Sequence, residues 1–221
     1  GRDYAETHHS PLTQIDQSHV SRLAPAWSVE VGSQGKLETT PIVWNGVLYG
    51  TSTFSIVYAI DARTGALKWR WDPALVKGGI ADGAARFCCG PVNRGVAIYK
   101  GKVYVGLLDG RLVALDAETG HVAWSVQTTP VGKDYSITGA PRIVKGKVVI
   151  GNGGGEYGVR GYLTAYDAET GKQAWRWFVV PGDPSKGLED RSMEMALKSW
   201  KGQWFKYGGG GTPWDGIAYD P

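Results

Sequence analysis

The sequence predicts an all-β fold, a β-propeller of four-stranded antiparallel blades, and three observations predict it. A frame of the form Ala-x-Asp-Ala-x-Thr-Gly-x-x-x-Trp occurs at 59–69, 114–124 and 165–175. Each copy follows two short runs rich in Val, Ile and Tyr. The 221 residues include 33 Gly and 10 Trp but only 4 Phe. This composition fits many tight turns between short strands and a repeated structural use of the indole.

Each blade is predicted to begin with a β-hairpin. The paired runs lie at 41–52, 95–108 and 140–153, and a glycine turn splits each of them. The turns are Asn45-Gly46, Lys100-Gly101 and Lys145-Gly146. Alternating apolar residues on both sides of a two-residue glycine turn are typical of hairpins.

The repeated frame supplies the third strand, a turn and the fourth strand. We expect the Asp and Thr side chains to bond backbone N–H groups within the turn, while Gly supplies a positive φ. The Trp is expected to lie between adjacent blades, with its N–H reaching a neighbouring carbonyl. A four-stranded sheet with two apolar faces cannot bury both alone, and radial stacking of the copies solves this. A β-sandwich with repetitive hairpins is the alternative, but three in-frame copies favour the propeller.

The chain is predicted to be the N-terminal part of a single propeller domain, 1–221. Three blades are expected at about 37–72, 90–127 and 136–180, with partial blades at 23–32 and 208–221. The stretch 23–32 resembles a lone fourth strand with Trp27 in the docking position. Three blades are too few for a closed ring, which usually has four to eight. A larger ring in the complete protein is therefore expected.

The segment 187–204 departs from the repeat. Asp190 or Ser192 is predicted to cap a short helix that runs to about Ser199. Met193, Leu197 and Trp200 follow at helical spacing. The pattern leaves open whether this excursion only packs on one face of the propeller or also binds a ligand.

Charge and hydropathy exclude two classes of function. The net charge is +3 and the basic residues form no run, so nothing indicates nucleic-acid binding. No apolar stretch approaches the length that a membrane span needs.

The only two cysteines, Cys88 and Cys89, are adjacent. Two inert buried thiols, half of a metal site or a disulfide between neighbours would each account for them. A metal site needs further ligands, and the chain has no other Cys. Two cysteines alone do not fix the redox compartment.

Together, the repeated frames, "CCGPVNRG" (88–95), "GNGGGEYGVRGYLTAYDAETGK" (151–172) and "GGGGTPWDGIAYDP" (208–221) resemble the quinoprotein alcohol dehydrogenases. These are periplasmic enzymes that use pyrroloquinoline quinone (PQQ) and calcium. The resemblance runs nearly end to end, and it implies an eight-bladed ring with the quinone in a central funnel. It also implies oxidation of primary alcohols to aldehydes by hydride transfer to PQQ. The frame alone also occurs in non-enzymatic propellers, so a scaffold module for protein–protein interaction is the alternative function.

The resemblance implies two walls for the flat cofactor. Cys88 and Cys89 match the family's vicinal disulfide on one side, and Trp214 matches an indole parallel to the quinone on the other. Thr212 matches a hydroxyl that bonds a cofactor carboxylate. Without the resemblance, the sequence offers a second interpretation of Trp214 as another indole that packs between blades.

In the plane of the cofactor, the resemblance implies contacts from several segments. Arg94 matches an arginine near the reactive C5 carbonyl, an electrostatic helper where a guanidinium polarises the quinone. Glu38 matches a carboxylate near a cofactor carbonyl, and Thr138 matches a hydroxyl eighteen residues before Glu156. The remaining implied cofactor-binding residues are Val92, Gly153, Gly154 and Gly155.

Glu156 is the one metal ligand that the resemblance implies in this chain. It matches a carboxylate that binds calcium, and a lanthanide is not excluded; without the resemblance it reads as a solvated turn residue. The family's catalytic Asp and a second calcium ligand, Asn, are expected beyond Pro221, so no catalytic base is assigned here. The 221-residue chain alone is therefore expected to be inactive. Electrons are expected to pass to a cytochrome c or to a haem c domain elsewhere in the protein.

Overall fold

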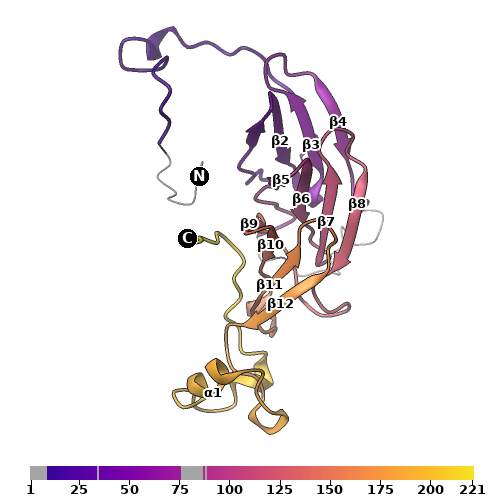
Figure 1. Ribbon diagram of the computed structural model, residues 1–221, viewed down its shortest axis with the longest axis vertical. Coiled ribbons are helices and arrows are strands. Elements are labelled where there is room, and N and C mark those ends of the chain that lie inside the picture. The colour runs from indigo at the N-terminus through magenta and orange to yellow at the C-terminus, as the bar shows by residue number, and fades with distance from the viewer. Residues whose placement is uncertain (1–8, 34, 76–86, 88) are drawn as a thin grey trace.

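The computed structural model describes residues 9–33, 35–75, 87 and 89–221, and its strands form three four-stranded antiparallel sheets (Figure 1). Within each sheet every strand pairs with the next one along the chain. The strands are β1 (Ile42–Trp44), β2 (Val47–Thr51), β3 (Val57–Asp61), β4 (Leu67–Trp71), β5 (Ala97–Tyr99), β6 (Lys102–Gly106), β7 (Arg111–Asp116), β8 (Val122–Gln127), β9 (Arg142–Val144), β10 (Lys147–Ile150), β11 (Tyr162–Asp167) and β12 (Gln173–Phe178). Each sheet is one blade, which confirms the predicted propeller fold.

The helices of the described residues are short. They are α1 (Arg191–Leu197) and the 3-10 turns η1 (Val20–Arg22), η2 (Thr53–Ser55), η4 (Gly155–Tyr157), η5 (Pro184–Lys186) and η6 (Trp204–Tyr207). In the part of the chain that the structure describes, none of them has the length and apolarity needed to cross a bilayer.

The three hairpins form where the glycine turns predict them. Both turn residues have positive φ in each case: 49° and 73° at Asn45-Gly46, 45° and 71° at Lys100-Gly101, and 46° and 74° at Lys145-Gly146. Two consecutive residues of this kind make the turn whose twist matches that of the strands. β1–β2, β5–β6 and β9–β10 pair around these turns.

The Asp-x-x-Thr-Gly turns between third and fourth strands also have the predicted hydrogen bonds. Asp116 Oδ1 accepts from the backbone N–H of Thr119 at 2.8 Å and from its hydroxyl at 2.8 Å. Asp61 and Asp167 accept the same pair of bonds from Thr64 and Thr170. Because these bonds stabilise the ionised form, the pKa of each of the three carboxyls lies below its ordinary value.

Adjacent blades meet through the predicted tryptophans. Each indole N–H donates to the carbonyl of the alanine in the next turn, and the acceptors are Ala62 for Trp27 (3.1 Å), Ala117 for Trp69 (3.0 Å) and Ala168 for Trp124 (3.0 Å). The ring lies flat on the turn glycine, since a Cβ atom at Gly120 would stand 2.8 Å from Trp69. The absence of a side chain at this glycine is therefore needed for docking as well as for its φ of 74°.

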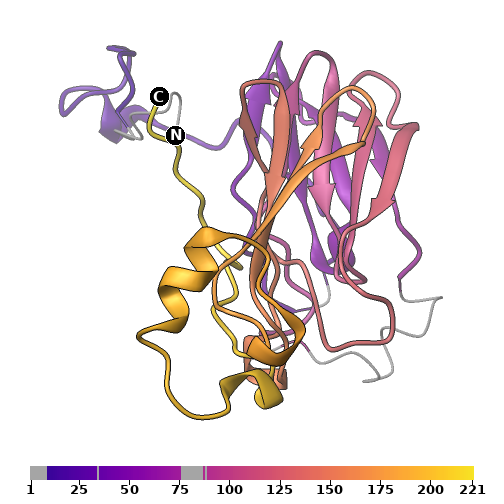
Figure 2. The same cartoon turned by 60° about the horizontal axis from the view of Figure 1, so that its bottom comes forward.

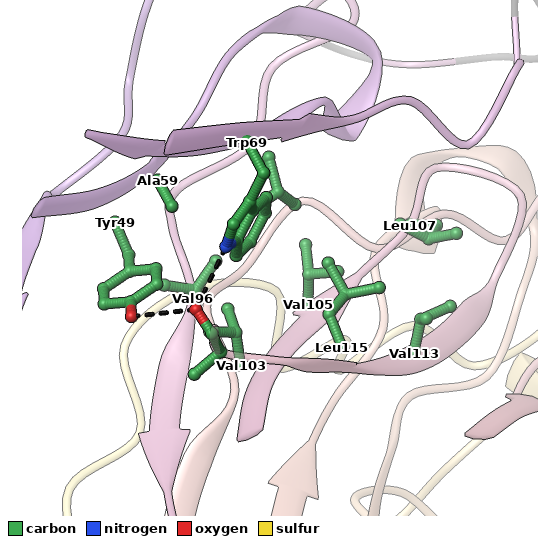
Figure 3. Packing of buried hydrophobic residues seen from close by; sticks show 11 residues of the cluster. Tyr49, Ala59, Trp69, Val96, Val103, Val105, Leu107, Val113 and Leu115 are labelled. Atoms are coloured by element: carbon green, nitrogen blue, oxygen red, sulfur yellow. Dashed lines mark hydrogen bonds between the residues drawn. The ribbon is translucent and has the colours of Figure 1, made fainter. Parts of the chain in front are cut away.

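A tyrosine adds a second donor to two of these carbonyls, a contact that the repeat analysis missed. Tyr49 donates to Ala117 at 3.0 Å, as Figure 3 shows beside the bond from Trp69, and Tyr104 donates to Ala168 at 3.1 Å. Around these bonds, apolar side chains of the first two blades form one buried cluster and those of the second and third blades another. The core therefore lies between the sheets.

The stretch 23–32 differs from the sequence expectation, because it forms no regular strand. A strand needs hydrogen-bonding neighbours, and no described strand lies beside this stretch in the sheets. Trp27 nevertheless docks on the first blade, and the Tyr58 hydroxyl donates to the carbonyl of Val31. The stretch 208–221 likewise forms only an isolated bridge between Arg160 and Gly210.

The predicted helix in 187–204 is present as α1, which packs at one end of the third blade (Figures 1 and 2). Asp190 caps it by accepting from the backbone N–H groups of Ser192 (2.8 Å) and Met193 (3.0 Å). Met193 is buried, with 2% of its surface exposed. The neighbouring Glu189 pairs with Arg160, with Nη2 and Oε2 3.0 Å apart, which ties this segment to the blade.

Candidate functional site

The loop that precedes β5 holds Arg94 between two other loops. Its backbone N–H donates to the carbonyl of Thr138 at 2.9 Å, and its carbonyl accepts from the N–H of Thr40 at 3.1 Å. Thr40 lies just before β1 and Thr138 just before β9. The residue is therefore fixed from both sides at the end of the blades opposite the hairpins.

Asn93 anchors this loop from within. It is buried, with 2% of its surface exposed. Its amide donates to the Ser55 hydroxyl at 3.1 Å and to the carbonyl of Gly106 at 2.8 Å, and its Oδ1 accepts from the N–H of Gly95 at 3.0 Å. A fully bonded buried amide is rigid, so Asn93 sets the position from which the Arg94 side chain starts.

The Arg94 guanidinium brings four segments together. Nη2 lies 2.7 Å from Glu38 Oε2, and Nη1 donates to the Thr138 hydroxyl at 2.7 Å. Nε lies 3.8 Å from Asp215 Oδ1, and Cζ lies 4.7 Å from the centre of the Trp214 ring. Only 17% of the Arg94 side chain is exposed, against 30% for Glu38, so this ion pair is partly shielded from solvent. Planar guanidinium donors in fixed directions suit carboxylate and carbonyl oxygens.

Trp214 and Thr212 come from the tail that follows η6. The tail lies along the third blade, where Gly161 donates to the carbonyl of Gly210 at 2.7 Å. Arg142 holds its other end by donating to the carbonyl of Ile217 at 2.7 Å. Trp214 is 45% exposed, so it offers apolar area beside the Arg94 cation.

The predicted glycine loop adjoins this tail. A Cβ atom at Gly153 would lie 3.8 Å from Trp214 Cβ, and one at Gly155 would lie 3.0 Å from the Thr212 hydroxyl. Gly154 has a φ of 101° and precedes η4, which carries Glu156 on an exposed position. Glu156 therefore lies in a loop that contacts the segment of Thr212 and Trp214.

Most of the predicted site residues lie in the described part of the chain. The structure joins Glu38, Arg94, Thr138 and Trp214 by direct contacts, and it places Gly153, Gly155 and Thr212 beside them. Val92 lies in the loop of Arg94 and is buried, with 1% of its surface exposed. Cys89 is exposed, and Cys88 lies outside the described residues, so the expected disulfide stays a prediction.

Three residues of this region were missed by the sequence reasoning. Asn93 and Asn152 are buried amides, and Asn152 Oδ1 accepts from the N–H of Tyr162 at 3.0 Å. Asp215 receives no role from the sequence, yet its Oδ1 lies 3.8 Å from Arg94 Nε. A buried Asn has no periodic signal in a single sequence, so only the fold reveals these roles.

A separate groove of about 770 Å³ lies between the loops of the third blade and the segment around α1. Arg160, Lys133, Lys186, Tyr135 and Phe205 are among its lining residues. It shares no lining residue with the contacts of Arg94.

The geometry can be compared with known proteins. A sequence profile of the PQQ family, described as the β-propeller domain of glucose, ethanol and alcohol dehydrogenases, matches residues 1–221. Quinohemoprotein alcohol dehydrogenase ADH-IIG of Pseudomonas putida is 56% identical over 100% of this chain and 30% of its own length. The quinohemoprotein alcohol dehydrogenase of Comamonas testosteroni is 52% identical over 100% of this chain and 31% of its own length.

Solved structures agree with these sequences. The structure of the Pseudomonas putida HK5 enzyme ADHIIG superposes with a TM-score of 0.94 at 56% identity, covering 100% of this chain and 32% of that chain. A europium-containing methanol dehydrogenase gives 0.86 at 39% identity, covering 100% and 39%. The chain thus spans about a third of the length of the solved relatives it matches.

Blades that dock through tryptophans define a β-propeller, and in the loops at one end a shielded guanidinium lies beside a half-exposed indole. The profile match over residues 1–221 identifies the family within the β-propeller class. The chain belongs to the PQQ β-propeller family of glucose, ethanol and alcohol dehydrogenases.

Proposed function

We propose that this chain is the cofactor-binding propeller portion of a PQQ- and calcium-dependent alcohol dehydrogenase that oxidises primary alcohols to aldehydes. The observation that carries the proposal is the convergence on Arg94 of Glu38, Thr138 and Trp214 from three separate segments. A propeller that served only as a scaffold would not need a shielded cation held in this way.

The donor set fits PQQ, a flat ortho-quinone with three carboxylates. Arg94 supplies positive charge, while Thr138 and Thr212 supply hydroxyl donors and the indole of Trp214 supplies a π-face. When bound, PQQ supplies a two-electron oxidant that accepts the hydride of the alcohol. A stacked aromatic face contributes roughly 1 kcal/mol beyond its buried area.

The part played by Arg94 is electrostatic. Glu38 and Thr138 fix two of its nitrogen atoms at 2.7 Å, so the guanidinium is already oriented before a ligand arrives. A preorganised cation beside a carbonyl oxygen stabilises negative charge that develops there. No catalytic base is proposed within this chain, and we place that role on a carboxylate elsewhere in the complete protein.

Glu156 is the proposed metal ligand of this chain. Calcium takes six to eight oxygen ligands, and a lanthanide accepts the same hard donors. Among the described residues no three His, Cys, Asp or Glu side chains cluster, and both ends of the Asn152 amide are already bonded. Glu156 is therefore one ligand of a set that other parts of the protein complete.

The finer features of the family are proposed for this protein as well. We place it in the periplasm, with a small alcohol as substrate and a cytochrome c or haem domain as electron acceptor. We also propose that Cys88 and Cys89 form a vicinal disulfide that is one wall of the cofactor site. Alkylation before and after reduction, followed by mass analysis of the peptide with both cysteines, should label neither residue without reductant and both with it. Labelling of the unreduced protein would show that the pair is not bonded.

Titration of the complete protein with PQQ in the presence of calcium tests the main proposal. Binding is followed by quenching of tryptophan fluorescence, and turnover by alcohol-dependent reduction of a dye. Arg94→Ala should weaken binding at least about tenfold, the loss expected for a charge-assisted bond to a carboxylate or carbonyl. Lys102→Ala is the matched control, because it removes a cation paired with Glu169 at 2.6 Å in another part of the fold.

Binding by the wild type that survives Lys102→Ala but not Arg94→Ala supports the proposal. A complete protein that binds no PQQ and reduces no dye would support the scaffold alternative instead. Equal affinity in Arg94→Ala and the wild type would show that PQQ binds elsewhere.

A further inference from the structure

We infer that Gly139 and Gly151 are positioning residues for Trp214, because their lack of a side chain lets the tail lie directly on the third blade. Neither residue belongs to the cofactor-contacting set. The inference about Trp214 stands on geometry alone, and its consequence for cofactor binding rests on the proposed function.

The tail is fixed to the blade through its backbone. Gly161 donates to the carbonyl of Gly210 at 2.7 Å, and Gly210 donates to that of Val159 at 3.1 Å. At the far end Arg142 donates to the carbonyl of Ile217 at 2.7 Å. Between these two anchors, Pro213 and Trp214 have no comparable backbone bond to the blade among the described hydrogen bonds, so packing decides their place.

That packing depends on two glycines. A Cβ atom at Gly151 would lie 2.0 Å from the carbonyl oxygen of Pro213, and one at Gly139 would lie 2.7 Å from that of Trp214. Real Cβ atoms essentially never approach an atom within 3.0 Å. The described segments at this contact leave no space that would hold a water molecule. An added methyl group therefore has to push the tail away from the blade.

The backbone at both positions is ordinary. Gly139 and Gly151 are not among the glycines with positive φ, so an alanine adopts the same backbone conformation without strain. The effect of a substitution is thus confined to the contact with Pro213 and Trp214. Gly216 is the matched control, since it lies in the same tail, also lacks a positive φ and has no atom within 4 Å of its Cβ position.

A displaced tail moves the indole relative to Arg94. The guanidinium of Arg94 is held by Glu38 and Thr138, so it does not follow the tail. The distance of 4.7 Å between Cζ and the Trp214 ring then increases, and the ring gains exposure. If the ring is one wall of the cofactor site, the same shift opens that site.

The test compares Gly151→Ala, Gly139→Ala and Gly216→Ala in the complete protein. The emission of Trp214 is isolated without cofactor by subtracting the spectrum of the same variant carrying Trp214→Phe. In Gly151→Ala and Gly139→Ala this emission should shift to the red and be quenched more by acrylamide, while Gly216→Ala should match the wild type. A second measurement, the PQQ titration, should show a loss of about tenfold or more in affinity for the first two variants.

Unchanged Trp214 emission in both Gly151→Ala and Gly139→Ala would overturn the inference. The added methyl group overlaps less with the tail in Gly139→Ala than in Gly151→Ala. Gly139→Ala can therefore still be measured if Gly151→Ala does not fold. A shift of emission together with absent PQQ binding by the wild type would uphold the positioning role and defeat the proposed function. A shift of emission with unchanged PQQ affinity would show that Trp214 is placed by these glycines but is not a wall of the cofactor site.

Discussion

The two ends of the blades are built on different principles. At the hairpin end, one set of contacts recurs from blade to blade, as in the Trp69 and Tyr49 bonds to Ala117 and the Trp124 and Tyr104 bonds to Ala168. At the loop end, the contacts of Arg94 occur once. Repetition therefore marks the part of the fold that holds the blades together, and its absence marks the candidate site.

The difference lies in how each end obtains its partners. In the repeats, a donor on one blade meets an acceptor in the equivalent turn of the next, so each interface is complete once two blades are present. At the loop end the guanidinium of Arg94 depends on Glu38, Thr138 and Trp214, which come from three loops outside the repeated frame. Substitutions at the hairpin end should thus lower stability, and those at the loop end should lower ligand binding.

The largest effect is expected at Trp69. This residue is 8% exposed, and its ring docks on Gly120 in the next blade. Trp69→Ala removes this contact and should lower the free energy of unfolding by about 3–5 kcal/mol. Trp69→Phe keeps most of the apolar area and loses the N–H donor, so about 1 kcal/mol is expected. Urea unfolding of the two variants measures the difference.

PQQ affinity provides the control for this prediction. Trp69→Phe, which should remain folded, is expected to bind PQQ like the wild type because Trp69 has no contact with the loop-end cluster. A large loss of affinity in this variant would mean that the two ends are coupled and would break the comparison.

Asn93→Ala is expected to lose less stability than Trp69→Ala, but it should also lose affinity for PQQ. Asn93→Ala leaves the N–H of Gly95 and the carbonyl of Gly106 without their side-chain partner in a buried place. The cost should be about 1–3 kcal/mol. Because the loop then no longer fixes Arg94, PQQ affinity should fall as well, and both quantities are measured on the same preparation.

The contrast with Trp69→Phe sharpens this second prediction. The two expected losses of stability overlap at about 1 kcal/mol, and both variants should remain folded at neutral pH, so a loss of PQQ affinity confined to Asn93→Ala would come from the placement of Arg94 and not from unfolding. Equal affinities would show that Arg94 keeps its place without Asn93.

Most of the blade architecture could be predicted because its signals are local. The turn Asn45-Gly46 fixes a hairpin through two residues, and Asp116 and Thr119 close their turn within four. Even the missed tyrosines have a signal, since Tyr49 and Tyr104 both stand three residues after the hairpin glycine. The third repeat has Val149 at that place, which weakened the pattern.

The site was harder to predict from the sequence because its contacts join distant parts of the chain. Arg94 and Thr138 are 44 residues apart, and their contact depends on how two blades stack. The resemblance identified both residues, but it did not show that Glu38 and Thr138 hold the same guanidinium. Asn93 was invisible, because a buried amide and an exposed loop amide look alike in one sequence.

The smallest effect is expected at the turn aspartates, and it depends on pH. Threonine donors hold the pKa of Asp116 below its ordinary value of 3.8, with the Thr119 hydroxyl as the largest cause. The folded-state pKa is the lower one, so this carboxylate stabilises the fold above its ordinary pKa and the contribution is lost as the pH falls through the folded-state value. Asp61 and Asp167 follow the same sign, with bonds from Thr64 and Thr170 as the causes.

Replacing all three by Asn should therefore destabilise the protein at neutral pH and matter less in acid. The difference in urea midpoint between wild type and variant should shrink as the pH is lowered from 6 to below the ordinary value of 3.8. Asp220→Asn, at an exposed position of the tail, shows the effect of removing one carboxylate charge outside these turns. PQQ affinity at neutral pH should stay unchanged, since these turns lie at the hairpin end. A difference in midpoint that persists undiminished in acid would mean that the turns are held by the geometry of the Asp side chain and not by its charge.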